Sequence, residues 1–132
     1  MRKRFNAHCA FSIAPRILMT VLIILFGALS LGMIVIAIPL AQRRVKPNPW
    51  YGFRTPTTVS NEKIWYDANA YAGRWLIGVG IFGFVAAIGL AFIPGLGEDG
   101  YAWAFLIVFT LAMTVMLIAS IRYLNSLKAQ SN

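Results

Sequence analysis

Three long stretches without a charged residue dominate the hydrophobic pattern of this chain. They cover residues 17–40, 75–94 and 101–121. A helix needs about 20 predominantly apolar residues to cross the hydrocarbon core of a bilayer, and in lipid it satisfies its backbone N–H and C=O groups internally. The pattern therefore predicts an all-α fold, an integral membrane protein with three transmembrane helices. Pro39 and Pro94 fall in the last turns of two of these stretches, where a lost hydrogen bond costs little.

The composition favours a membrane protein over a soluble domain. Hydrophobic residues make up 59% of the 132 residues and charged residues only 12%, whereas an average soluble domain has about 25% charged residues. Disorder is excluded because it requires low hydrophobicity. A net charge of +8 would suggest nucleic acid as the partner of a soluble protein. Here we interpret the basic residues as topology signals and partners of the lipid bilayer, without direct nucleic-acid binding.

The chain divides into an N-terminal basic segment, residues 1–16, and a membrane domain, residues 17–132. The basic start resembles a signal peptide, but apolar residues continue through Ile38, beyond the about 7–15 residues of an h-region, so we expect a retained span. Lys and Arg are twice as numerous in the loop of residues 41–74 and the C-terminal tail as in the N-terminal segment. The positive-inside rule then places the loop and the C-terminus in the cytoplasm and the N-terminus outside the plasma membrane.

The loop of residues 41–74 is much longer than the usual connection in a helical bundle. It is rich in aromatic residues, which argues against a slack linker. Prolines flank Asn48 and follow Thr55, favouring extended backbone, and Gly52 can adopt a positive φ. We therefore predict an ordered, non-helical excursion that places Trp50 and Tyr51 at the level of the lipid headgroups.

A helix is expected to follow this excursion and to continue into the second span. Ser60 is a suitable N-cap, and Glu62 would lie in the first turn, where the helix dipole favours a carboxylate. At about 100° per residue, one stripe of the helix is polar near the loop and mostly small inside the membrane. Small residues let another helix approach closely, so we predict a helix-packing surface at Gly80, Gly83, Ala87 and Ala91.

The same stripe carries Glu62, Trp65 and Asn69 toward the loop. We expect Arg54 to pair with Glu62, because its planar guanidinium can hold a carboxylate and still donate to backbone carbonyls. Together with Asn69, this pair would hold the loop against the helix. The constellation is either a purely structural clamp or a partner-binding site, and the residue pattern leaves both readings open.

Residues that could carry out catalysis are scarce. No ionisable residue lies in the middle of a span, which disfavours an ion-coupled transporter. His8 and Cys9 do not form a metal-ligand set, and the sequence has no catalytic Ser/His/Asp arrangement or phosphate-binding loop. We therefore expect neither an enzyme nor a protein that binds a metal or a cofactor.

The loop and the helix after it carry a long motif that resembles the SdpI-type bacterial membrane proteins. Its positions are Asn48, Gly52, Arg54, Thr55, Pro56, Thr58, Glu62, Trp65, Asn69 and Gly73. The resemblance extends over residues 39–121, and the best-known member, which is larger, carries the matching region as its C-terminal half. It implies a protein that confers immunity against a peptide toxin, that signals by binding a cytoplasmic transcriptional repressor, or that does both.

Two other classes of function stay open. One is a structural or accessory membrane subunit that packs its small-residue stripe on partner helices. The other is a small transporter, which would have to be a homo-oligomer because three helices enclose little space.

Overall fold

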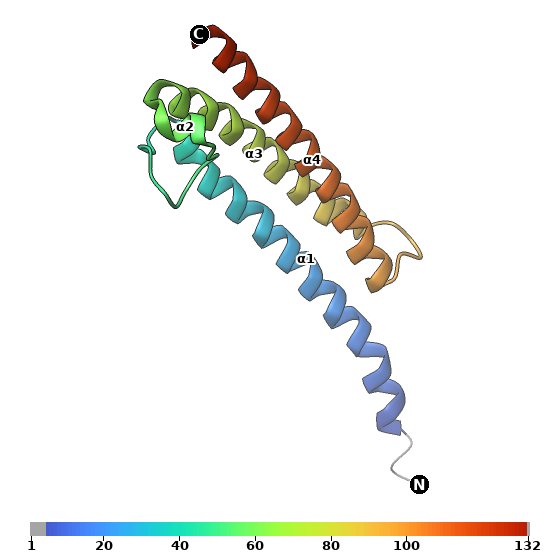
Figure 1. The fold of residues 1–132 in the computed structure, drawn as a ribbon. Helices are drawn as coiled ribbons and strands as arrows, with labels where there is room; N and C mark the ends of the chain where they lie inside the picture. The colour runs from blue at the N-terminus through green and yellow to red at the C-terminus, as the bar shows by residue number, and fades with distance from the viewer. Residues whose placement is uncertain (1–4, 132) are drawn as a thin grey trace.

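The structure, a computed structural model, describes residues 5–131, and it describes side chains over residues 16–130. The described residues form four helices and no strand: α1 (Phe5–Ala41), α2 (Pro56–Ser60), α3 (Glu62–Leu90) and α4 (Glu98–Ser131). The three long helices form an elongated bundle in which α3 packs against both α1 and α4 (Figure 1). The short helix α2 lies in the connection between α1 and α3, at the same end of the bundle as the C-terminus (Figure 1).

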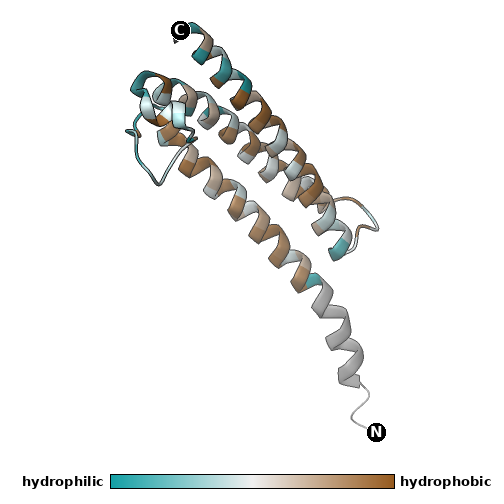
Figure 2. Cartoon of the chain, viewed as in Figure 1, coloured by the Kyte–Doolittle hydropathy of each residue, from teal (hydrophilic) through white to brown (hydrophobic). Residues whose placement is uncertain are grey.

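The predicted fold class, an all-α protein with three membrane-spanning helices, is confirmed. Three segments are long and apolar enough to cross a membrane: Arg16–Ala41, Glu62–Leu90 and Glu98–Gln130. Hydrophobic residues run along the coloured part of α1 and the middle of α4, while hydrophilic residues gather at the loop and at the C-terminal end of α4 (Figure 2). The helices extend beyond the charge-free stretches of the sequence. Of the expected basic segment, Arg2, Lys3 and Arg4 lie outside the described residues.

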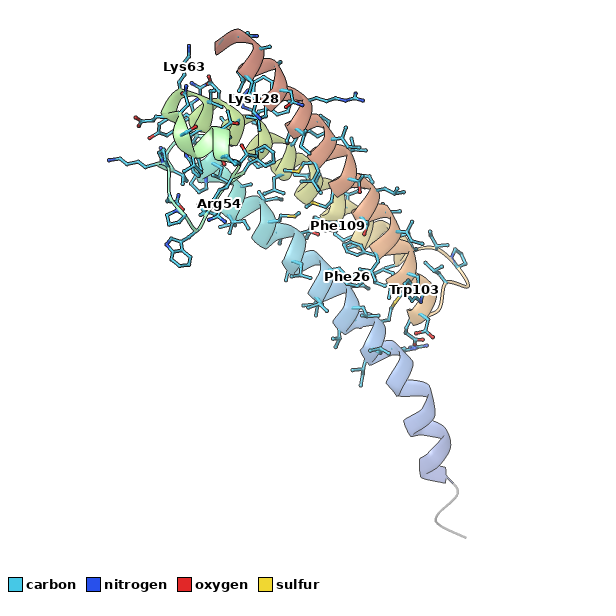
Figure 3. The ribbon with its side chains drawn as sticks, viewed as in Figure 1. Phe26, Arg54, Lys63, Trp103, Phe109 and Lys128 are labelled. Atoms are coloured by element: carbon cyan, nitrogen blue, oxygen red, sulfur yellow. The ribbon has the colours of Figure 1, made fainter. Side chains whose placement is uncertain are left out.

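Aromatic rings hold the half of the bundle that lies away from the loop. Phe26 of α1 (labelled in Figure 3) stacks on Phe105 of α4, with ring centroids 4.2 Å apart, and both are buried with Tyr101. The Tyr101 hydroxyl donates a hydrogen bond of 2.8 Å to the carbonyl of Ala87. At the end of α3 the N–H of Ala91 bonds to Ile88, so the hydroxyl satisfies a carbonyl that the helix leaves unpaired.

Small residues of α3 lie where this helix meets its neighbours. A Cβ at Gly80 would come within 2.9 Å of the backbone oxygen of Ser30 on α1. One at Gly83 would lie 2.8 Å from the Ser30 hydroxyl, and Ala87 is fully buried. Ala91 is partly buried beside the aromatic cluster. The small-residue stripe is therefore covered by helices of the same chain, which argues against its use as a surface for an accessory subunit.

Replacing Gly83 with leucine should lower the free energy of unfolding by about 1–3 kcal/mol, because the added side chain overpacks the bundle. The nearest atoms are the Ser30 hydroxyl and a ring carbon of Phe109, at 2.8 and 2.9 Å from an added Cβ. Gly89→Leu is the matched control, since a Cβ there meets nothing within 4 Å. Thermal unfolding in mild detergent, followed by circular dichroism, measures the difference. Equal stability of the two variants would contradict this packing.

Candidate functional site: the loop between α1 and α3

The loop begins with a sharp turn at the end of α1. The N–H of Arg43 bonds to the carbonyl of Leu40, and that of Arg44 bonds to the carbonyl of Pro39, both at 3.0 Å. Arg43 has a φ of +59°, the left-handed conformation that usually follows a helix in this type of cap. Its guanidinium forms an ion pair of 2.7 Å with Asp67 on α3. The turn and the ion pair together direct the chain back toward α3.

Asn48 organises the tip of the loop through its side chain. Its Oδ1 accepts hydrogen bonds from the N–H groups of Trp50 and Tyr51, at 2.9 and 2.8 Å. Its Nδ2 donates to the carbonyl of Lys46 at 2.8 Å. An asparagine side chain commonly closes a turn by bonding the backbone two residues on. The tip is therefore held by local contacts, and Trp50 projects from it with 89% of its surface exposed.

Asn69 joins the loop to α3. Its Oδ1 accepts a hydrogen bond of 2.6 Å from the N–H of Phe53, while its Nδ2 donates to the carbonyl of Trp65 at 3.0 Å and to that of Phe53 at 3.4 Å. The Asn69 side chain is 2% exposed. A buried amide without such partners would cost about 1–3 kcal/mol, so these contacts fix how the loop lies on the helix.

Gly52 allows this close approach. It has a φ of +117°, a conformation that residues with a side chain rarely adopt. A Cβ at this position would also lie 2.5 Å from the Oδ1 of Asn69 and 3.3 Å from the ring of Trp65. Both the backbone conformation and the available space therefore require glycine.

Trp65 makes a second connection between α3 and the loop. Its indole N–H donates a hydrogen bond of 2.8 Å to the carbonyl of Val45, and the side chain is fully buried. Phe53 packs against a buried cluster formed by Ile64 and Ala68 of α3 and by Leu124 of α4. The loop thus contacts the polar groups of α3 and the apolar residues shared by α3 and α4.

The short helix α2 follows, and the sequence pattern had not predicted it. Thr55 caps α2, with its hydroxyl accepting from the N–H of Thr58 at 3.2 Å, and its own N–H donates to the Thr58 hydroxyl at 2.8 Å. Pro56 occupies the first turn, where its missing N–H costs nothing. The expectation of a wholly non-helical excursion is therefore wrong over residues 56–60, where a reciprocal capping box starts a helix.

The N-cap of α3 also lies one residue later than expected. Ser60 is the last residue of α2, and Asn61 caps α3 by accepting a hydrogen bond of 3.2 Å from the N–H of Ile64. Serine and asparagine are about equally good caps. Because α2 precedes it, only Asn61 has the extended backbone that an N-cap needs.

The expected ion pair between Arg54 and Glu62 is absent among the side chains that the structure describes. Both residues are exposed, and the ion pair across the loop instead joins Arg43 to Asp67. Arg43 reaches Asp67 because the left-handed turn places it beside α3, whereas Glu62 lies in the exposed first turn of that helix. Of the three residues expected to pin the loop, Asn69 makes the connecting hydrogen bonds.

Gly73 lies where α3 crosses the end of α1. A Cβ at this position would come within 2.7 Å of the backbone nitrogen of Ala41 and 3.1 Å of the carbonyl oxygen of Ala37. Backbone atoms cannot move aside as a flexible side chain can, so only glycine fits. The motif residue Gly73 therefore sets the distance between the two helices just below the loop.

A small apolar cavity lies under the loop. It has a volume of about 230 Å³ and is lined by residues 51–53 together with Leu40, Ala72, Leu76 and other residues of the bundle. The Tyr51 hydroxyl is buried and has no hydrogen-bond partner among the described residues. Burial raises the pKa of Tyr51 above its ordinary value of 10.0.

Several contacts of the site involve residues that the sequence analysis did not select. They are Arg43, Val45, Phe53, Asn61 and Asp67. The sequence signal for α2 was present, because Thr55 and Thr58 flank a proline at the spacing of a capping box. No local pattern identifies Arg43 as the partner of Asp67, since that contact depends on how the loop folds.

Replacing Asn69 with leucine should lower the free energy of unfolding by about 1–3 kcal/mol, because the buried N–H of Phe53 loses its acceptor. Cleavage by trypsin after Arg54 should become faster for the same reason. Asn125→Leu is the control, since Asn125 is exposed on α4. Thermal unfolding and the rate of cleavage in mild detergent give the two readouts. If both variants behaved like the unaltered chain, Asn69 would not hold the loop.

Comparison with known proteins places the chain in a family. The model of the SdpI/YfhL protein family matches residues 44–123, which include the whole motif, all of α3 and most of α4. No curated protein and no solved structure matches the chain. Because the matching region covers more than half of the sequence, including the loop described above, the chain belongs to the SdpI/YfhL protein family.

Proposed function

We propose that this membrane protein confers immunity against a peptide toxin, signals by binding a cytoplasmic regulator, or does both, and that its loop is the recognition surface. Family membership supports a membrane protein of the SdpI type. The proposed role in immunity or signalling is supported by the way the motif residues are used in the structure. In this proposal the protein acts by binding a partner, without catalysis and without a cofactor.

The observation that carries the proposal is a division within the motif. Most motif residues are occupied in building the loop, through the hydrogen bonds of Asn48 and Asn69, the cap at Thr55 and the close contact at Gly52. Arg54 and Glu62 differ from these residues, because both are exposed. Charged side chains held on a folded support and left exposed are suited to binding a partner.

The surroundings of these two residues support the same reading. The loop end of the bundle also exposes Trp50 and Lys63 (Figure 3 labels Arg54 and Lys63 there). Tryptophan and arginine are enriched among the residues that contribute most to protein–protein binding. The surface therefore combines charges of both signs, from Arg54, Lys63 and Glu62, with the aromatic side chain of Trp50, which suits a partner that offers both charged and apolar groups.

For the topology we propose that the loop and the C-terminus face the cytoplasm and that the N-terminus lies outside. The loop and α2 lie at the same end of the bundle as the C-terminal end of α4, and the first described residues of α1 lie at the other end (Figure 1). The basic residues of the loop support this orientation through the positive-inside rule. A cytoplasmic loop is also the orientation in which a cytoplasmic regulator can reach it.

Replacing Arg54 or Glu62 with alanine should abolish protection while the amount of protein in the membrane stays the same. The protein is expressed in a bacterium that is sensitive to the cognate secreted peptide toxin, and survival is counted after challenge. Loss of a hydrogen bond to a charged group weakens binding by about tenfold or more. Arg44→Ala is the control, because Arg44 is an exposed loop arginine outside the motif. Full protection in both motif variants would remove Arg54 and Glu62 from the recognition surface.

The proposed topology is tested by labelling with a membrane-impermeant maleimide. Cys9 is the single cysteine of the sequence, and its side chain lies outside the described side chains. It should react in intact cells. In a Cys9→Ser, Trp50→Cys double variant, the introduced thiol at the exposed loop tip should react only after the cells are permeabilised. The reverse result would invert the orientation.

A further inference from the structure

A groove runs between α3 and α4 and is lined by these two helices alone. One part has a volume of about 420 Å³ and is almost wholly apolar. Its lining residues are Trp75, Gly78, Val79, Phe82, Ala112 and Val115. Gly78 forms an open floor, because a Cβ at this position would meet nothing within 4 Å. This part of the groove lies within the charge-free stretches of both helices.

Toward the loop end the groove acquires a polar rim. A second hollow of about 410 Å³ is lined by Tyr71, Arg122 and Tyr123 together with apolar residues of α4. Val115 lines both hollows, so the apolar part leads into the polar part. The rings of Tyr71 and Tyr123 stack with centroids 4.2 Å apart, which joins the two helices at the rim.

The charge at the rim is positive. Arg122 and Arg74 are both exposed, and no acidic residue lines either hollow. Arg74 directly precedes the charge-free stretch of α3 and Arg122 directly follows that of α4. Arg122 therefore lines the groove just beyond the charge-free stretch of α4, whereas Arg74 lines neither hollow.

We propose that this groove binds one anionic phospholipid of the bilayer, with its phosphate at Arg122 and an acyl chain along the groove over Gly78. A guanidinium matches a phosphate with two parallel hydrogen bonds, and basic pockets between transmembrane helices bind anionic headgroups. The apolar hollow accepts the chain of the same molecule. This site is separate from the loop surface of the proposed function, and neither depends on the other.

A second copy of the chain fits the groove less well than a lipid does. Its acidic residues would have to reach Arg122 in the groove, and the sequence has only four acidic residues. Asp67 is engaged with Arg43. Glu98 and Asp99 begin α4 at the opposite end of the bundle, and Glu62 lies about three helical turns from Arg74. The bilayer supplies a negative charge and an apolar chain in one molecule.

Native mass spectrometry of the full chain tests the proposal. The protein is reconstituted in equal amounts of phosphatidylglycerol and phosphatidylcholine and then released into mild detergent. One phosphatidylglycerol should be retained in preference to phosphatidylcholine. Arg122→Gln should lower that preference about fivefold, and Gly78→Leu should reduce retention of both lipids by filling the groove. Arg54→Gln and Gly89→Leu are the matched controls, since Arg54 lies in the loop and Gly89 lies outside the groove.

The proposal would be contradicted if the two lipids were retained equally, or if Arg122→Gln and Arg54→Gln lowered the preference for phosphatidylglycerol equally. Either result would mean that lipid binds nonspecifically around the bundle. A second measurement uses the unaltered chain, so that its result does not depend on whether a variant folds. Photoactivatable phosphatidylglycerol should crosslink mainly to residues 71–82 and 112–123, which contain the groove residues. Crosslinks spread evenly over α1 as well would contradict the proposal.

Discussion

The buried amide of Asn69 is the contact on which the rest of the loop depends. It is 2% exposed and bonds to both backbone groups of Phe53 and to the carbonyl of Trp65. A buried polar group stabilises a structure only when its partners are in place. The contact therefore requires Gly52 at its positive φ and positions Phe53 against the bundle. One side chain of α3 thus links the polar loop to the membrane-spanning helices.

This arrangement shows how the motif builds the loop, and it is compatible with the recognition role that we propose for the exposed motif residues. α3 begins beside the loop and continues without a break to Leu90, so the helix that carries Asn69 also carries Gly73 and Gly80 against α1. The loop therefore rests on a rigid element rather than on a flexible connection. Side chains that take no part in these contacts, such as Arg54, are held at the surface by those that do. This is how a membrane bundle can present a defined polar surface to a partner.

The membrane spans could be predicted because a long stretch without charged residues is typical of a membrane-spanning helix. The periodicity of α3 indicated which of its residues share a face. Asn69 was selected from that periodicity. The pairing of charges was not predictable in the same way, because Arg43 reaches Asp67 only after α1 ends in a left-handed turn. The helix α2 could have been found from its capping residues. The choice between Ser60 and Asn61 as a cap depended on α2 and so required the structure.

The central claim is that the loop is folded onto α3 by hydrogen bonds to buried side chains. Amide hydrogen exchange of the full chain in a bilayer tests it most directly, with a free peptide of residues 41–61 as the reference for unprotected exchange. The account predicts that the amide of Phe53, bonded to Asn69 at 2.6 Å, exchanges much more slowly in the protein than in the peptide. Exchange at the same rate in both would show that the loop is not held on α3 and would contradict the account.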